Sequence, residues 1–203
     1  MARMHSRGRD WRAALMAFAI AALLASCASG GGTTRHVVPG EMRAGKLTLN
    51  SEMEWTRAST SRYQLWTMDG ELLNLLYLIH TVKEGDYIFL GQRESKRRPD
   101  APYYHRGMRE DELRDLVSDG LLNAGFVGVS PDNLRPATFG DRAGLRFDLA
   151  MQTAEGLQYQ GMVAMFEHEK GLALAIFIAP REFYFPRDQA AVSRMLDTIR
   201  WQG

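Results

Sequence analysis

Three consecutive extended segments between residues 145 and 179 constrain the fold of this chain most strongly. The first, "LRFDLAM", places its large apolar residues on one face of a strand and charged or small residues on the other. The apolar face consists of Leu145, Phe147, Leu149 and Met151. The pairs Glu155-Gly156 and Lys170-Gly171 then delimit "LQYQGMVAMFEH" and "LALAIFIA". This pattern predicts an antiparallel meander of strands.

A further pair of strands is predicted around Asp69-Gly70, a dipeptide that favours a tight hairpin turn. The dipeptide separates "RYQLWTM" from an almost continuously apolar run, Leu72 to Ile79. Such a run is compatible with a buried helix by propensity. Its turn and its companion segment favour a central strand that is covered on both faces.

Two amphipathic helices are expected on either side of the meander in sequence. The first follows the acidic residues 110–112, which suit the first turn of a helix, and Gly125 can end it. Its apolar face consists of Leu113, Leu116, Val117, Leu121 and Ala124. The second helix is expected from about Pro186, with an apolar stripe of Val192, Met195, Leu196 and Ile199. Both helices need an apolar sheet to cover.

The order of these elements resembles the PsbP-like and Ran-release-factor-like superfamily over residues 46–201. The resemblance rests on an N-terminal pair of strands containing "MEWTRA", on "LWTMDGELLNLL", "EDELRDLVSDGLLNAG", "FGDRAGLRFDLAM" and "GLALAIFIAP", and on a final helix ending "MLDTIRW". It implies an α+β fold, an α/β/α sandwich whose central, largely antiparallel sheet has helices on both faces. Known members are mostly non-catalytic, so the resemblance implies a binding role and supplies no catalytic residues.

The N-terminal segment has the pattern of an export signal. Four arginines within residues 3–12 precede an apolar run, Ala13 to Ala25, which is too short to span a membrane. "Leu24-Ala25-Ser26-Cys27" is similar to the lipobox of bacterial lipoproteins, which implies lipidation at Cys27. The alternative is a signal peptide cleaved elsewhere. We therefore expect a lipoprotein signal peptide over 1–26.

The remaining chain is expected to form one globular domain after a spacer. Residues 27–45 are rich in Gly, Ser and Thr, which predicts a lipidated cysteine and a flexible tether, followed by a single domain over 46–203. Residues 91–107 read as a long surface loop. Cys27 is the single cysteine, so no disulfide is expected. The near balance of 25 basic and 24 acidic residues argues against nucleic-acid binding.

No residue constellation in the sequence predicts a catalytic site, a metal site or a cofactor. The best metal-like cluster is "EHEK", Glu167 to Lys170, but His168 would point away from both glutamates in a strand, so a solvated hairpin end is favoured. His36, His80 and His105 have no neighbour at ligand spacing. Gly140 and Gly144 in "FGDRAG" lack the ending of a phosphate loop and are expected to form a turn.

Two segments combine Tyr with Arg near proline, as residues of protein interfaces do: "PYYHR" at 102–106 and "REFYFPR" at 181–187. We expect Tyr103, Tyr104 and Tyr184 to be exposed and available for partner contact. Phe183 and Phe185 are expected to be buried, because large apolar side chains usually are.

The expected function is that of a lipid-anchored, non-catalytic module that binds an envelope protein, on the periplasmic face. The membrane is contacted through the lipid anchor. Ala28 follows the cysteine where inner-membrane retention would usually place Asp, which favours the outer membrane. The alternative is an envelope small-ligand carrier or an enzyme whose site forms only in three dimensions. A deep polar pocket would favour that alternative, and an exposed aromatic patch would favour the binding module.

Overall fold

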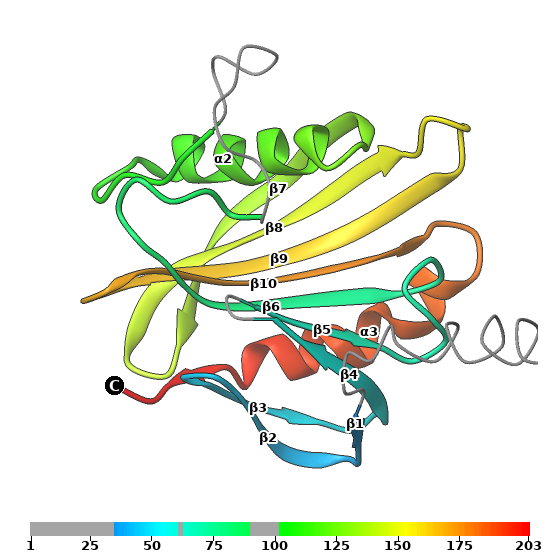
Figure 1. Ribbon diagram of the computed structural model, residues 1–203, viewed down its shortest axis with the longest axis horizontal. Coiled ribbons are helices and arrows are strands. Elements are labelled where there is room, and N and C mark those ends of the chain that lie inside the picture. The colour runs from blue at the N-terminus through cyan, green and yellow to red at the C-terminus, as the bar shows by residue number, and fades with distance from the viewer. Residues whose placement is uncertain (1–34, 61–62, 90–101) are drawn as a thin grey trace, which may run out of the picture. The chain divides into compact units, whose positions relative to one another are not determined.

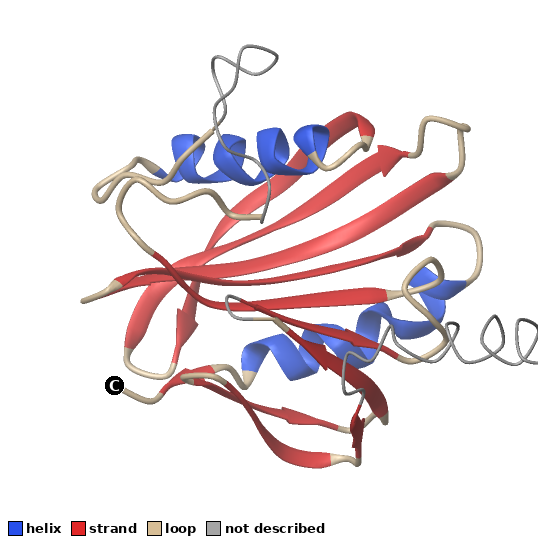
Figure 2. Cartoon of the chain, viewed as in Figure 1, coloured by secondary structure: helices blue, strands red, loops and turns tan. Residues whose placement is uncertain are grey.

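The computed structural model describes residues 35–60, 63–89 and 102–203. Within these ranges the chain forms two helices and eleven strands (Figures 1 and 2). In chain order the elements are β1 (Arg35–Val37), β2 (Gly40–Ala44), β3 (Leu47–Ser51), β4 (Trp55–Ser59), β5 (Tyr63–Thr67), β6 (Leu75–Val82), α2 (Glu110–Asn123), β7 (Val127–Phe139), β8 (Arg142–Gln152), β9 (Gln158–His168), β10 (Gly171–Pro180), α3 (Tyr184–Asp197) and β11 (Arg200–Trp201).

A large antiparallel sheet dominates the domain. Its strand order is β1-β4-β5-β6-β10-β9-β8-β7, and every neighbouring pair is antiparallel. The predicted meander is confirmed as β8-β9-β10, and the predicted hairpin as β5-β6. A second sheet of order β11-β3-β2 joins the end of the chain to its first strands. The domain is therefore a mixed α/β fold built on antiparallel pairing.

Strand β10 is buried along its whole length, and its side chains alternate between two apolar clusters. One cluster contains Leu172, Leu174, Ile176 and Ile178, together with the apolar residues of α2. The other contains Ala173, Ala175, Phe177 and Ala179, together with the apolar residues of α3. Because successive side chains of a strand point to opposite faces, the two helices pack against different sets of sheet side chains.

The two predicted helices are present, with small differences at their ends. Arg109 precedes α2, and its backbone N–H donates to Glu112 Oε2 at 2.7 Å, which closes a capping interaction. Gly125 follows with a φ of +107°, a left-handed conformation that suits glycine at a helix end. Helix α3 begins at Tyr184, two residues before the expected start at Pro186. Ile199 lies beyond α3, but its side chain is buried in the same cluster.

Three predicted boundaries differ from the structure. Residues 35–44 were expected in the tether, but they form β1 and β2, which pair with β4 and β3. The segment "MEWTRA" was expected within a pair of strands, but β3 and β4 belong to different sheets. The apolar run starting at Leu72 enters β6 only at Leu75, because residues 71–73 form a turn. The signal segment, Cys27, residues 28–34 and most of the expected loop 91–107 lie outside the described residues.

We predict that the α3 interface carries a large share of the stability. Leu196 is fully buried in the α3 cluster, so Leu196→Ala should lower the free energy of unfolding by about 2–5 kcal/mol. Leu122 on α2 is 45% exposed, and the same change there should have little effect. Denaturant unfolding of both variants measures the difference. Equal losses would contradict the assignment of Leu196 to the core.

Candidate interaction surface

Four connections meet at one end of the large sheet, which we call the loop end. They are the β5–β6 turn (68–74), the α2–β7 turn (124–126), the β8–β9 turn (153–157) and the β10–α3 connection (181–183). The strand register places these connections at the same end of the sheet, because the paired residues next to them lie side by side. The pairs are Leu75 with Ile178, Pro180 with Tyr159, and Gln152 with both Gln158 and Val127. All four connections lie at the right of Figure 1.

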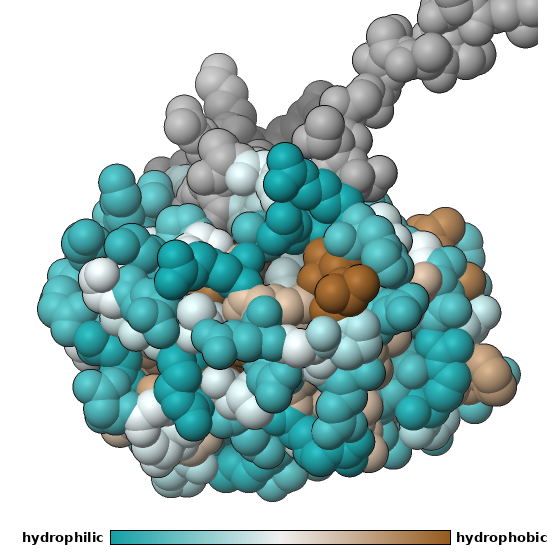
Figure 3. All heavy atoms as spheres, turned by 90° about the horizontal axis from the view of Figure 1, so that it is seen from below, coloured by the Kyte–Doolittle hydropathy of each residue, from teal (hydrophilic) through white to brown (hydrophobic). Residues whose placement is uncertain are grey.

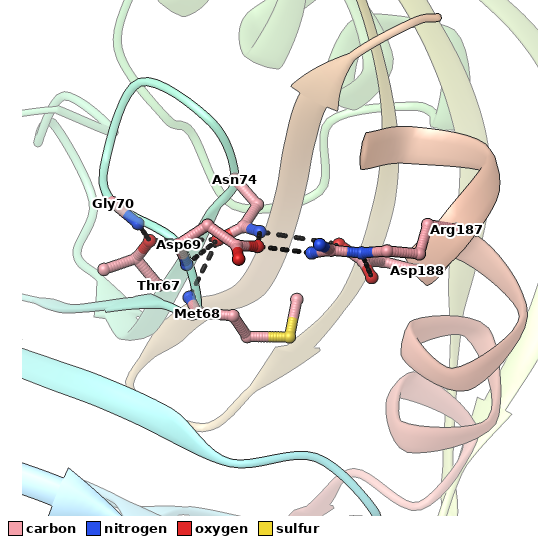
Figure 4. Close-up of polar contacts among 7 residues, drawn as sticks. All are labelled: Thr67, Met68, Asp69, Gly70, Asn74, Arg187 and Asp188. Carbon is pink, nitrogen blue, oxygen red and sulfur yellow. Dashed lines mark hydrogen bonds and ion pairs between the residues drawn. The ribbon is translucent and has the colours of Figure 1, made fainter. Parts of the chain in front are cut away.

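Asn74 holds the β5–β6 turn together from within the fold (Figure 4). Its side chain is buried, and its Oδ1 accepts hydrogen bonds from the Thr67 hydroxyl at 2.9 Å and from the Met68 N–H at 2.8 Å. The Asp69 N–H donates to the same oxygen at 3.2 Å. Gly70 takes a φ of +119°, which an L side chain rarely adopts. The turn is longer than the predicted tight hairpin, and one amide organises it.

The first turn of α3 is tied to this β5–β6 turn by Arg187. Its guanidinium donates to Asp69 and, at 2.7 and 2.9 Å, to both carboxylate oxygens of Asp188. Asn74 Nδ2 donates to Asp69 Oδ2 at 2.5 Å, so the side chains converge, as Figure 4 shows. The hydrogen bond from Arg187 holds the pKa of Asp69 below its usual value. The carboxylates in turn raise the pKa of Arg187.

Arg187 also fixes two aromatic rings at the start of α3. Its guanidinium carbon lies 5.1 Å from the centroid of Tyr184 and 5.7 Å from that of Phe183, both within cation–π range. The two rings meet edge to face at 5.1 Å. Phe183 nevertheless remains 61% exposed, so a large apolar ring is held in a defined position facing solvent.

Exposed apolar side chains gather at the loop end. Five of the exposed large hydrophobic residues belong to it or to the element ends beside it: Leu72, Leu122, Val127, Leu157 and Phe183. Tyr159 joins two of the connections, because its hydroxyl donates to the Leu72 carbonyl at 2.6 Å and its ring packs on Phe126 at 5.7 Å. Figure 3 shows brown atoms at several separate places at its right, with a larger brown group nearer the centre, on a mostly hydrophilic surface. We call these five residues the apolar patch.

The three tyrosines that were expected to be exposed differ in their exposure to solvent. Tyr103 is 36% exposed and contacts the rings of Tyr87 and His105. Tyr104 is fully buried, which corrects the expectation, because its hydroxyl donates to Glu167 at 2.5 Å. Burial and this hydrogen bond raise the pKa of Tyr104. Tyr184 is half-buried beneath Arg187. Cys27 lies outside the described residues.

The two phenylalanines of "REFYFPR" also differ. Phe185 is buried as expected and stacks on Phe177 at 6.1 Å, whereas the expectation of burial was wrong for Phe183. Sequence reasoning missed Leu72, Asn74 and Arg187 as parts of this surface. The basic and aromatic composition of "REFYFPR" was the signal for Arg187; Leu72 was assigned to a buried strand.

The "EHEK" cluster was expected to be a solvated hairpin end, but its histidine packs inside the domain. His168 is buried and stacks on Trp201, with ring centroids 3.7 Å apart. Its Nε2 contacts the His80 carbonyl at 3.1 Å, and its Nδ1 accepts from the Lys170 N–H at 3.2 Å. Glu167 and Glu169 are engaged elsewhere, by Tyr104 and Arg142. Among the described residues no cluster of His, Cys, Asp and Glu is arranged to hold a metal.

A groove lies beside α3. It has a volume of about 470 Å³, and its polar lining residues are Arg135, Asp148, Gln160, Gln189 and Ser193. Arg135 donates to Asp148 at 3.3 Å, so the charges of this groove compensate each other. Neither helix in the described part of the chain has the length and apolar character needed to cross a bilayer.

We predict that Asn74→Ala loosens the loop end. The change removes the acceptor for two backbone N–H groups and one hydroxyl, which should lower the free energy of unfolding by about 1–3 kcal/mol. Amide hydrogen exchange of Met68 and Asp69 should accelerate. Asn50→Ala, at an exposed position, serves as the matched control. Unchanged exchange at both amides would exclude the organising role of Asn74.

A second prediction concerns acid sensitivity. Burial lowers the pKa of His168 below its usual 6.5, so below pH 6.5 the unfolded chain binds a proton that the folded chain does not. Stability present above pH 6.5 is therefore lost as the pH falls towards the folded pKa. His168→Gln should unfold more easily at about pH 7.5 but lose less stability on acidification to about pH 5.5. Denaturant titrations at the two pH values test this; an equal loss in both proteins would contradict it.

Comparisons with known proteins support the fold and go no further. No protein-family model and no curated protein sequence matches the chain. Among solved structures, the chain is similar to cyanobacterial PsbP from Synechocystis sp. PCC 6803, with a TM-score of 0.50 and 7% sequence identity. The match covers 86% of this chain and 95% of that one. The chain therefore has a PsbP-like fold, as the sequence resemblance implied, and no residue role carries over at this identity.

Proposed function

We propose that this protein is a non-catalytic binding module whose contact surface is the loop end. The observation that carries the proposal is an exposed apolar patch on a rigid support: Leu72 is 80% and Phe183 61% exposed. The Asn74 and Arg187 network holds the connections that carry them. Exposed apolar side chains on fixed connections are typical of protein-binding sites, because little entropy is lost on binding.

The proposal includes a three-layer arrangement, an α/β/α sandwich with α2 and α3 on opposite faces of the large sheet. It is supported by the alternation of β10 side chains between the α2 cluster and the α3 cluster. In this arrangement both faces of the sheet are covered, and a partner can reach the ends of the strands and the two edges, β1 and β7. The proposed domain begins at β1 and so includes residues 35–45.

The proposed address is the cell envelope, with the domain anchored through lipid on Cys27 and the outer membrane favoured. The support is the charged and apolar pattern of residues 1–26 and the lipobox-like sequence before Cys27. Two or more acyl chains hold a protein firmly, whereas a single chain is marginal. In the proposed protein the anchor provides attachment and the loop end provides recognition.

The anchor is tested by Cys27→Ser. We expect the wild-type protein to incorporate labelled palmitate and to sediment with membranes, and the variant to do neither. Density-gradient separation of inner and outer membranes then locates the wild-type protein. Palmitate labelling that persists in the variant would exclude lipidation at this cysteine.

The binding role is tested by site-specific photo-crosslinking in cells. A photoreactive residue in place of Leu72 should give a discrete adduct with an envelope protein. The same residue in place of Asp141, in the β7–β8 turn at the opposite end of the sheet, should not. Adducts at Asp141 and none at Leu72 would place the contact surface elsewhere.

The alternative, a carrier of a small ligand or an enzyme, is favoured by one observation, the groove beside α3. Its volume of about 470 Å³ is within the range of small-molecule sites. A small molecule that co-purifies with the protein and protects Gln160 and Gln189 amides from hydrogen exchange would favour this alternative over the binding module.

A further inference from the structure

Exposed carboxylates lie close in sequence to residues of the apolar patch. Glu71 is adjacent to Leu72, Glu182 is adjacent to Phe183, and Glu155 precedes Leu157 by two residues. All three are exposed, and in the described part of the chain none has a hydrogen-bond or ion-pair partner. A fourth exposed carboxylate, Asp119, lies on α2 one turn before Leu122. The patch thus has an acidic rim, defined by these four residues.

The cations at the loop end do not balance this rim. Arg187 is engaged by Asp69 and Asp188 at the base of the patch. Arg181 is the arginine of the β10–α3 connection, and it is exposed. Burial and, to a lesser extent, the nearby Asp115 raise the pKa of Asp119. The rim thus has four exposed carboxylates, whereas the four connections contribute one exposed arginine, Arg181.

We infer that the partner of the loop end is a polypeptide segment with aliphatic or aromatic side chains flanked by Lys or Arg. The inference rests on the proposed binding function and specifies its partner. The apolar patch provides affinity through removal of apolar area from water. The rim carboxylates would lose hydration on contact, which costs free energy unless a cation replaces the water. Cations on the partner supply that compensation and steer its approach.

The same charges disfavour the other occupants of an apolar surface. An anionic lipid headgroup or an acidic protein would meet Glu71, Glu155 and Glu182 with like charge. A second copy of the chain joined through this face by two-fold symmetry would place one acidic rim against the other. A polypeptide segment that is both cationic and apolar complements the apolar patch and the acidic rim at once.

Leu72 and Phe183 are the expected anchor residues. They are the two most exposed side chains of the apolar patch, at 80% and 61%. They belong to the two connections that Arg187 joins, so their spacing is fixed before binding. Preformed anchors reduce the entropy lost on association.

The test is a fluorescence-anisotropy titration of residues 27–203 with Cys27→Ser, which is the processed chain without its lipid and without the cationic and apolar segment 1–26. The probe is a fluorescein-labelled amphipathic peptide of Leu and Lys, with a Leu/Glu peptide and a Ser/Lys peptide as references. We expect saturable binding of the Leu/Lys peptide that weakens with salt, and weak binding of both references. Leu72→Ser with Phe183→Ser, and separately Glu71→Gln with Glu182→Gln, should each weaken binding about tenfold.

Matched controls lie away from the loop end. Tyr103→Ser changes an exposed aromatic, and Asp141→Asn neutralises an exposed carboxylate in the β7–β8 turn. Both should leave the dissociation constant within about twofold. Denaturant unfolding of every variant verifies folding, which is expected because all of the altered side chains are exposed.

Three results would overturn the inference. The first is equal binding of the Leu/Glu peptide, and the second is an equal effect of the control variants. The third is binding of phosphatidylglycerol vesicles, or self-association, that depends on Leu72 and Phe183. If the peptide does not bind while photo-crosslinking at Leu72 still yields an envelope protein, the partner chemistry is wrong and the binding function stands. If both fail, the binding function itself is wrong.

Discussion

The burial of β10 on both faces is the constraint on which the rest of the domain depends. An antiparallel sheet can leave one face in water, but every residue of β10 is buried, so both of its faces are covered by other parts of the domain. Its large side chains, such as Leu174 and Ile176, fill the cluster shared with α2. Its small ones, such as Ala173 and Ala175, belong to the cluster shared with α3. Three alanines and Phe177 thus alternate along β10 with the Leu and Ile residues of the other cluster.

Much of the fold could be predicted because its signals are local. The period of two in residues 145–151, the glycine-containing turns and the spacing of apolar residues in α2 each lie within a short window. The strands at 35–44 could not be identified in this way, since a short segment with Gly and Pro has the composition of a linker. Pairing with β3 and β4 makes these residues strands. The pairing of Trp201 in β11 with Leu47 in β3 joins the two ends of the domain, and no local sequence pattern predicts it.

The candidate surface was predicted only in part, for a similar reason. Tyr103 and Tyr104 are neighbours of the same type, and the difference in their burial depends on Glu167, which is 63 positions away. The segment "REFYFPR" was identified by composition, but its exposed ring proved to be Phe183. Phe185 turns inward once α3 has begun, whereas Phe183 precedes the helix. The position of Arg187 depends on Asp69 across the domain, which sequence spacing does not show.

The early start of the folded domain, at Arg35 in β1, has a consequence for the reach of the protein. If Cys27 carries the lipid, residues 28–34 are the segment of chain between the lipid anchor and the first strand of the domain. A fully extended chain spans at most about 3.3–3.6 Å per residue, so this segment can span about 25 Å at most. The domain would then stay close to the membrane surface that holds the anchor. A short linker of this kind raises the effective concentration of partners that lie near the same membrane.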